Sequence, residues 1–184
     1  MKSPFCNVEL LDHGGHGIVF QVRDGIANLA LKLFFGSDIE EAREYANQEY
    51  GKLTRLRWLE GVPTVYTLFP ELNFEDFGEL PFEPSHNETI GFTMELMTDV
   101  SSIYGSSVQV PRAYFTQLRM LARTVHKRGL ALPNDLEHNL FEREDGLPVS
   151  FDWGDAEYLV RGRKTVLTRA DFSRIRELEN TYTG

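Results

Sequence analysis

A lysine interrupts one of the most apolar stretches of the chain. Asn28 to Phe35 reads NLALKLFF, and the alternation of side chains along a strand puts Lys32 on the same face as Ala30 and Phe34. A lysine on such a face either extends its aliphatic stem until the ammonium reaches water or meets an acidic partner. The fold of this chain must satisfy one of these two conditions.

The next predicted element carries a candidate partner. Ser37-Asp38-Ile39-Glu40 has the S-x-x-E pattern of a helix start. Apolar residues then recur at helical spacing and predict one buried stripe: Ile39, Ala42, Ala46, Leu53 and Leu56. Glu49 falls on this stripe. It either pairs with Lys32, because a lone charge facing a core is costly, or lies at the edge of the stripe in water.

The residues before Lys32 predict an antiparallel set of strands. Val8 to Leu11 and Ile18 to Val22 are short apolar runs, separated by the glycine-rich sequence Asp12-His13-Gly14-Gly15-His16-Gly17. Asp24-Gly25 is typical of a hairpin turn. Glycine-rich turns let backbone N–H groups approach phosphate oxygens closely, although most glycine clusters are ordinary turns.

An acidic segment follows a predicted strand at 64–69. Residues 71–88 contain six acidic side chains and no Lys or Arg, with phenylalanines interleaved. We expect a long loop here, either solvated or docking a basic partner. The apolar run 90–97 predicts a buried strand, and the polar residues after it suggest a lobe boundary.

The second half of the chain predicts two helices around a hairpin. Pro111 is expected at the first position of one helix, which Lys127-Arg128-Gly129 ends, and Thr168-x-x-Asp171 is expected to cap the other. Between them, two apolar runs flank the turn 142–146. This hairpin would hold Asn139 near Asp152, and such oxygen ligands suit a hard cation.

Composition excludes several classes of protein. The net charge is -9 with a pI near 5.1, so we expect no general affinity for nucleic acid. The single cysteine, Cys6, forms no intrachain disulfide and suggests a reducing compartment. The first residues lack the apolar core of a signal peptide, and no apolar run is long enough to span a membrane. We therefore expect a cytoplasmic protein, with delivery into a host cell left open.

The order of these features resembles the protein-kinase-like fold from about Val8 to Gly154. ELLDHGGHGIVF is similar to the kinase glycine-rich loop, with Asp12 at its first glycine, and LALK is similar to V-A-I-K. NQEYGKLTRL resembles the helix that carries the glutamate partner, and FTMELM resembles the hinge. VHKRGLALPNDLEHNLF resembles the catalytic loop, and FDWG resembles D-F-G.

The resemblance implies an ATP site with Mg²⁺, or Mn²⁺ as an alternative. It implies that Lys32 holds phosphates, that Glu49 orients it, and that Asn139 and Asp152 bind metal. Other implied nucleotide contacts come from the glycine-rich loop, the strands beside it and the hinge: Gly14, Gly15, Gly17, Val19, Ala30, Met94, Glu95 and Met97.

The catalytic-loop match departs from the family at the proton acceptor. The family's Asp lies five residues before the metal-binding Asn, and that position is Asn134 here, with Asp135 one step later. An amide does not accept a proton as a carboxylate does. Either Asp135 reaches the substrate hydroxyl, or transfer proceeds without a strong base because the loose transition state needs little from one.

The C-terminal part also departs, because 30 residues follow Gly154 and no A-P-E motif is present. We therefore expect an α+β, bilobal kinase-like fold. It would have an antiparallel N-lobe with one helix and a hinge at 1–97, and a truncated, mainly helical C-lobe at 98–184. These proportions resemble those of lipopolysaccharide-core (Kdo) kinases and short bacterial effector kinases.

Three functions stay open at this point. The first is an atypical kinase that transfers the γ-phosphate of ATP to a hydroxyl of a protein, sugar or small molecule. The second is a pseudokinase that binds nucleotide or a partner, favoured by Asn134. The third is a regulator whose partner supplies the missing substrate platform. Segment 71–88 is the candidate partner surface for the last two.

Overall fold

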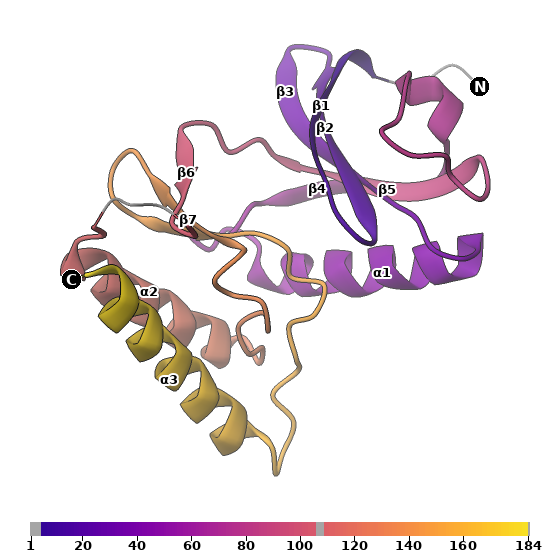
Figure 1. Cartoon of the computed structure of the whole chain (residues 1–184). Coiled ribbons are helices and arrows are strands. Elements are labelled where there is room, and N and C mark those ends of the chain that lie inside the picture. Colours follow the sequence, from indigo (N-terminus) through magenta and orange to yellow (C-terminus); the bar gives the residue numbers. More distant parts are fainter. Residues whose placement is uncertain (1–4, 106–108, 184) are drawn as a thin grey trace. The chain divides into compact units, whose positions relative to one another are not determined.

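The computed structural model describes residues 5–105 and 109–183 and has an α+β fold (Figure 1). The chain folds into two compact units, one formed by 1–54 and 64–97 and the other by 55–63 and 98–184. The expected first lobe, 1–97, included residues 55–63. These residues belong to the second unit instead, where the Ser150 N–H donates to the Gly61 carbonyl at 2.9 Å.

The first unit is built on a five-stranded antiparallel sheet of order β1-β2-β3-β5-β4. Its strands, in chain order, are β1 (Cys6–His13), β2 (Gly17–Asp24), β3 (Ala27–Phe34), β4 (Val65–Asn73) and β5 (Glu88–Glu95). The expected hairpin at Asp24-Gly25 joins β2 to β3, with Gly25 at the positive φ that such a turn requires. Strand β3, which carries Lys32, is therefore central and flanked by β2 and β5.

Helix α1 (Ile39–Leu56) lies along one face of this sheet (Figure 1). Its expected stripe is confirmed at Ala42, Ala46, Leu53 and Leu56, which are all buried. The expected capping pair of Ser37 and Glu40 is wrong by one residue. The Asp38 carboxylate accepts the Glu41 N–H at 2.9 Å, and the Glu41 carboxylate accepts the Ser37 N–H at 2.6 Å.

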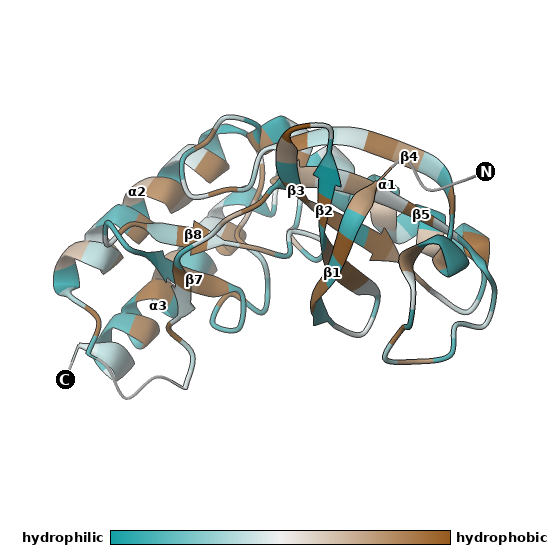
Figure 2. Cartoon of the chain, turned by 90° about the horizontal axis from the view of Figure 1, so that it is seen from above, coloured by the Kyte–Doolittle hydropathy of each residue, from teal (hydrophilic) through white to brown (hydrophobic). Residues whose placement is uncertain are grey.

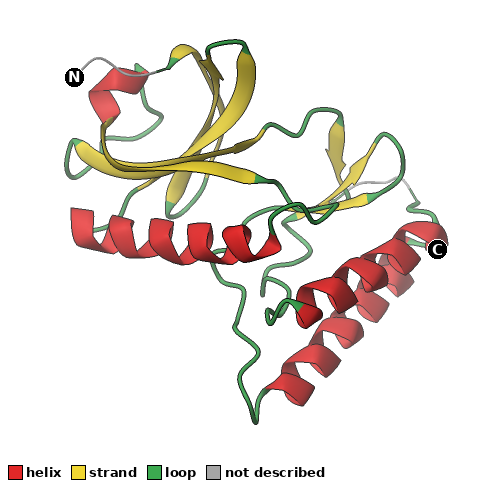
Figure 3. Ribbon diagram, turned by 180° about the vertical axis from the view of Figure 1, so that it is seen from behind, coloured by secondary structure: helices red, strands yellow, loops and turns green. Residues whose placement is uncertain are grey.

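The connection between β4 and β5 packs on the sheet and is not simply a solvated loop. It begins with the short 3-10 helix η1 (Phe74–Phe77), drawn in Figure 3 on the side of the sheet away from α1. Phe74 and Phe77 join the core formed by β2 and β3, and Leu80 and Phe82 pack against it. The apolar residues of this segment are thus structural, while its acidic residues remain at the surface.

The second unit combines two helices with a small sheet. Helices α2 (Arg112–Lys127) and α3 (Lys164–Tyr182) pack against each other, and apolar and polar residues alternate along both (Figure 2). The antiparallel sheet has the order β6-β7-β8 and consists of β6 (Val100–Ser102), β7 (Leu140–Arg143) and β8 (Pro148–Ser150). The hairpin β7–β8 was expected. Strand β6 was not, so this unit is less helical than expected.

Two expected helix starts differ in the structure. Pro111 stands just before α2, at its N-cap, rather than at its first residue. Helix α3 begins at Lys164, so Thr168 and Asp171 lie inside it and do not cap it. Asp171 is buried, with 1% of its surface exposed, which shows that it has a different structural role.

Within the described ranges, no helix combines the length and apolar character that crossing a membrane requires.

Candidate functional site

The Lys32 ammonium and the Glu49 carboxylate form the expected pair. Nζ donates to Oε2 at 2.7 Å and to Oε1 at 3.0 Å, so both carboxylate oxygens are engaged. The two side chains are 12% and 4% exposed. At this burial each charge depends on the other, because desolvation makes a single buried ion unfavourable. The alternative with Glu49 in water is therefore wrong.

Several of the expected nucleotide contacts share the sheet face that bears Lys32. Lys32 lies opposite Val19 of β2, and Ala30 lies opposite Met94 of β5. Residues directly opposite each other in an antiparallel pair project from the same face. Val19, Ala30, Lys32 and Met94 therefore form one patch, on the face that α1 covers with Glu49.

The glycine-rich turn closes tightly beside Lys32. The Gly14 N–H donates to the Gly17 carbonyl at 2.8 Å. A Cβ added at residue 17 would stand 3.1 Å from Lys32 Cε, whereas one at Gly14 or Gly15 would meet nothing within 4 Å. A side chain at position 17 would thus press on the lysine, and the turn leaves open space at 14 and 15. This arrangement fits a loop whose backbone N–H groups approach phosphate.

The expected hinge is only partly available to a ligand. The Glu95 N–H donates to the Thr64 carbonyl at 2.8 Å, and Glu95 Oε2 accepts the Thr64 N–H at 3.2 Å. The Glu95 amide and carboxylate are therefore used within the sheet. Met97 follows the end of β5 and is half-buried. Adenine recognition by the Glu95 carbonyl and the Met97 backbone stays a prediction.

In the second unit, the β7–β8 hairpin holds Asn139 beside the residue that precedes Asp152. The Phe151 N–H donates to the Asn139 carbonyl at 2.9 Å, and Asn139 Nδ2 donates to the Asp135 carbonyl at 3.2 Å. The second bond orients the amide and leaves Oδ1 as its oxygen donor. Asp152 has φ +48°, a conformation that is unfavourable for a residue with a side chain and often marks functional sites.

Asp155, which the sequence analysis did not single out, ties the loop together. Its Oδ2 accepts the Asn134 N–H at 2.9 Å, and the Asn134 and Asp135 N–H groups both act to lower its pKa. Burial raises the pKa of Asp155, and the neighbouring charges of Asp152 and Asp135 raise it further, against the lowering by these two N–H groups. The negative charges of Asp152 and Asp135 thus act on Asp155 within one loop region, a local field that favours a bound cation.

The oxygen donors here fit magnesium better than a transition metal. Across the part of the chain that the structure describes, no group of three or more His, Cys, Asp or Glu side chains is arranged to hold a metal ion. Asn139 Oδ1 and the Asp152 carboxylate are hard oxygen donors. Mg²⁺ is commonly held by one or two carboxylates and completes its shell with water and substrate phosphates.

Asn134 and Asp135 differ in how they are held. Asn134 is bound twice to Asp155, through its N–H and through Nδ2, which donates to the Asp155 carbonyl at 3.3 Å. Asp135 is exposed, and its backbone carbonyl accepts the His138 N–H at 3.1 Å. The Asn134 side chain is therefore structural, and the Asp135 carboxylate projects from the loop surface.

Asp171 anchors this loop from α3 and was not foreseen as a site residue. Its Oδ2 contacts His126 Nε2 at 2.7 Å and accepts the Leu132 N–H at 3.0 Å. Arg174 also pairs with Asp171 and donates to the carbonyls of Pro133 and Asn134, at 2.7 Å each. The available signal was the spacing of Asp171 with the apolar Ile175 and Leu178 on one helix face, the same logic that identified Glu49.

The candidate residues therefore form two local arrangements, one in each unit. Lys32, Glu49 and the glycine-rich turn belong to the first, and 134–155 belongs to the second. No family model matches this sequence, and a search of curated proteins finds no similar one.

Proposed function

We propose that this protein is an atypical member of the protein-kinase-like superfamily that uses ATP and Mg²⁺ to phosphorylate a hydroxyl group. The observation that carries the proposal is the buried pair formed by Lys32, on the central strand β3 beside a glycine turn, and Glu49 of helix α1. A fold keeps a buried charge pair at a cost, because apolar residues of similar volume often stabilise a protein as well or better. A functional use of the ammonium explains its retention.

Lys32 would neutralise phosphate charge from a fixed position. The two bonds to Glu49 restrain the flexible lysine side chain before any ligand arrives, so less ordering is needed on binding. The turn of Gly14, Gly15 and Gly17 would cover phosphate oxygens, with the Gly14 N–H closing the turn on the Gly17 carbonyl and N–H groups such as that of Gly15 directed to the ligand. The apolar residues Val19, Ala30 and Met94 would contact the adenine.

Asn139 and Asp152 would hold the metal ion. A bound Mg²⁺, or Mn²⁺ as an alternative ion with similar ligand preference, would offset the negative charge that develops during transfer. The Asn139 amide is oriented by its bond to the Asp135 carbonyl. The charge of Asp152, close enough to raise the pKa of Asp155, supplies the attraction.

Asp135 would accept the proton of the acceptor hydroxyl. Asp135 is exposed, and its backbone carbonyl is held by the Asn139 amide at 3.2 Å and by the His138 N–H at 3.1 Å. Asn134 would set the shape of the loop, because its amide is bound to Asp155. A base within reach of the proton typically contributes ~10²–10⁴-fold to rate.

Transfer of label from γ-³²P-ATP tests this function. Purified protein with Mg²⁺ is offered generic protein, sugar and small-hydroxyl acceptors, and autophosphorylation and ATP hydrolysis are followed in parallel. We expect transfer that needs Mg²⁺ or Mn²⁺ and is lost in Lys32→Met and Asp152→Asn. The absence of transfer, autophosphorylation and hydrolysis together would count against phosphotransferase activity.

A pseudokinase is the second candidate, favoured by the amide of Asn134 at the position where the family has its base. It would bind nucleotide through Lys32 and release it unchanged. ATP binding that is unaffected by Asp135→Ala, combined with no transfer, would support this function. A binding module or regulator of this kind needs a partner surface, for which segment 71–88 is the candidate.

A further inference from the structure

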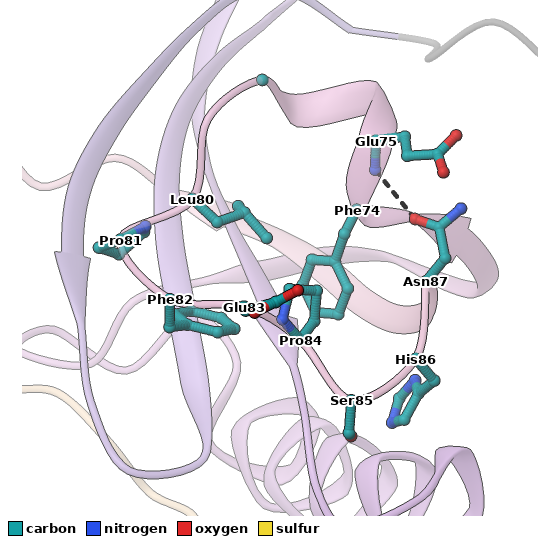
Figure 4. Close-up of a pocket in the computed structure, with 11 residues that line it drawn as sticks. Phe74, Glu75, Leu80, Pro81, Phe82, Glu83, Pro84, Ser85, His86 and Asn87 are labelled. Carbon is teal, nitrogen blue, oxygen red and sulfur yellow. Dashed lines mark hydrogen bonds between the residues drawn. The ribbon is translucent and has the colours of Figure 1, made fainter.

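The β4–β5 connection forms a groove in the first unit that the proposed chemistry does not use. It forms an open hollow of about 810 Å³ lined by residues 74, 75, 78 and 80–87, which include Leu80, Phe82 and Pro84 as well as Glu75 and Glu83 (Figure 4). In Figure 4 the Leu80 side chain extends toward Phe74, which is buried, so the accessible apolar surface comes from Leu80, Phe82 and Pro84. Glu75 and Glu83 are exposed.

This groove is held in shape by contacts of its own backbone and rings. The Phe74 N–H donates to the Asn87 carbonyl at 2.9 Å, and the Glu75 N–H donates to Asn87 Oδ1 at 3.1 Å. The centroids of the Phe82 and Phe35 rings lie 4.5 Å apart. A preformed groove binds more tightly than a flexible one, because the cost of ordering it has been met during folding.

A second cavity extends the groove toward the start of α1. It has about 520 Å³ and shares Ser85, His86 and Asn87 with the first. Its other lining residues include Asp38 and Glu88. The two cavities share the wall formed by residues 85–87, and together they are called the track below. A ligand that contacted both would be an extended chain rather than a compact small molecule.

The charged side chains along the track are all acidic. Residues 71–88 carry six carboxylates and no Lys or Arg. The described residues that line the two cavities also include no Lys or Arg. Such a surface repels phosphate-rich partners and attracts cationic ones.

We propose that this track docks a basic, extended segment of a partner protein. The aliphatic stems of its Lys and Arg residues would lie on the partly exposed Leu80, Phe82 and Pro84, with the cationic groups directed to Glu75 and Glu83. Long basic side chains combine an apolar stem with a charged end, and Arg also stacks favourably on aromatic rings. This docking requires no nucleotide, so it stands or falls independently of phosphoryl transfer.

Peptide arrays test the proposal on the whole chain. One array alternates Lys or Arg with Leu or Pro, and a matched array has Glu in place of each basic residue. Fluorescence anisotropy then measures the affinity of labelled basic peptides at low and at high salt. We expect basic-apolar peptides alone to bind, salt to weaken the binding, and hydrogen–deuterium exchange to slow within 74–87 when the peptide is present.

Charge reversal separates the groove from the overall acidity of the protein. Glu75→Lys/Glu83→Lys should lower affinity at least tenfold. Glu60→Lys/Glu144→Lys makes the same change in net charge at exposed sites outside the track and should leave affinity within about twofold. Equal losses in the two variants, equal binding of the acidic array, or exchange protection elsewhere in the chain would each overturn the proposal.

Discussion

Lys32 of β3 donates to both carboxylate oxygens of Glu49 of α1, at 2.7 and 3.0 Å. The pair joins the central strand of the sheet to the helix that covers it, across 17 positions of sequence. Each residue projects from an otherwise apolar face. The pair is thus both a structural link within the first unit and the most distinctive chemical group in it.

Removing one member of this pair should destabilise the protein strongly. Glu49→Gln removes the carboxylate charge that both bonds of this pair depend on, and loss of one partner of a buried pair typically costs about 3–5 kcal/mol. Urea unfolding measures the difference. Lys32→Met/Glu49→Met removes both charges and should be clearly more stable than Glu49→Gln. If the losses in Lys32→Met and in Glu49→Met add up to the loss in the double variant, the two residues are not coupled.

Substitutions of Asp135 and of Asn134 should affect activity unequally. Asp135→Asn should lower the turnover number by about 10²-fold or more, because it removes the proposed proton acceptor without changing side-chain volume. Asn134→Ala should raise KM or destabilise the loop, because the bond to Asp155 is lost. Steady-state kinetics separates the two effects. An unchanged turnover number in Asp135→Asn would assign the proton to another group.

Loss of the loop anchor should reduce transfer more than nucleotide affinity. Asp171→Asn weakens the contacts to His126, Leu132 and Arg174, whereas Lys32 lies in the other unit. The matched control is Glu179→Gln, which breaks a second link between α3 and α2, to Arg119, away from the loop. Nucleotide affinity and turnover number are measured for both. A fall in turnover number of the same size in the control would mean that helix packing, and not the loop, is responsible.

Acidification should remove the stabilising contribution of the ionised Glu41 carboxylate at the start of α1. The Ser37 N–H, with help from the Tyr45 and Ser37 hydroxyls, lowers the pKa of Glu41 from 4.5 to about 2. Because the folded-state pKa is the lower one, this contribution is present above pH 4.5 and is lost as the pH falls toward 2. The difference in free energy of unfolding between wild type and Glu41→Gln should therefore shrink as the pH falls from 4.5 toward 2.

NMR titration of the Glu41 carboxyl carbon measures the pKa of Glu41 directly. In Ser37→Ala, which removes one of the donating hydroxyls, the pKa of Glu41 should rise from about 2 but stay below 4.5, because the backbone N–H remains. An ordinary pKa for Glu41 in wild type would contradict the observed capping contact.

The features that the sequence predicted correctly are those with local periodicity. Alternation along Asn28 to Phe35 located β3 and its lysine face, and helical spacing put Glu49 among buried positions. The hairpin β7–β8 followed from two apolar runs around a turn. In each case the residues that define the pattern are close in sequence, so short-range physics is sufficient.

The features that were missed depend on contacts between distant segments. Strand β6 pairs with β7 across about forty positions, and a run of three residues is too short to show a period. Asp171 was interpreted as a helix cap because its partners, His126 and Leu132, lie on other segments. The phenylalanines of 71–88 were assigned to a loop because their burial depends on the strands beneath them.

Equilibrium binding of ATP in the presence and absence of Mg²⁺, measured by isothermal titration calorimetry, tests directly whether Lys32 and Asp152 belong to a nucleotide site. We expect wild type to bind ATP more tightly with Mg²⁺, Lys32→Met to lose at least tenfold in affinity, and Asp152→Asn to lose the dependence on Mg²⁺. The Glu60→Lys variant, changed at an exposed site outside the proposed nucleotide contacts, serves as the control and should bind as wild type does. ATP binding that is absent in wild type, or unchanged in Lys32→Met, would contradict the account.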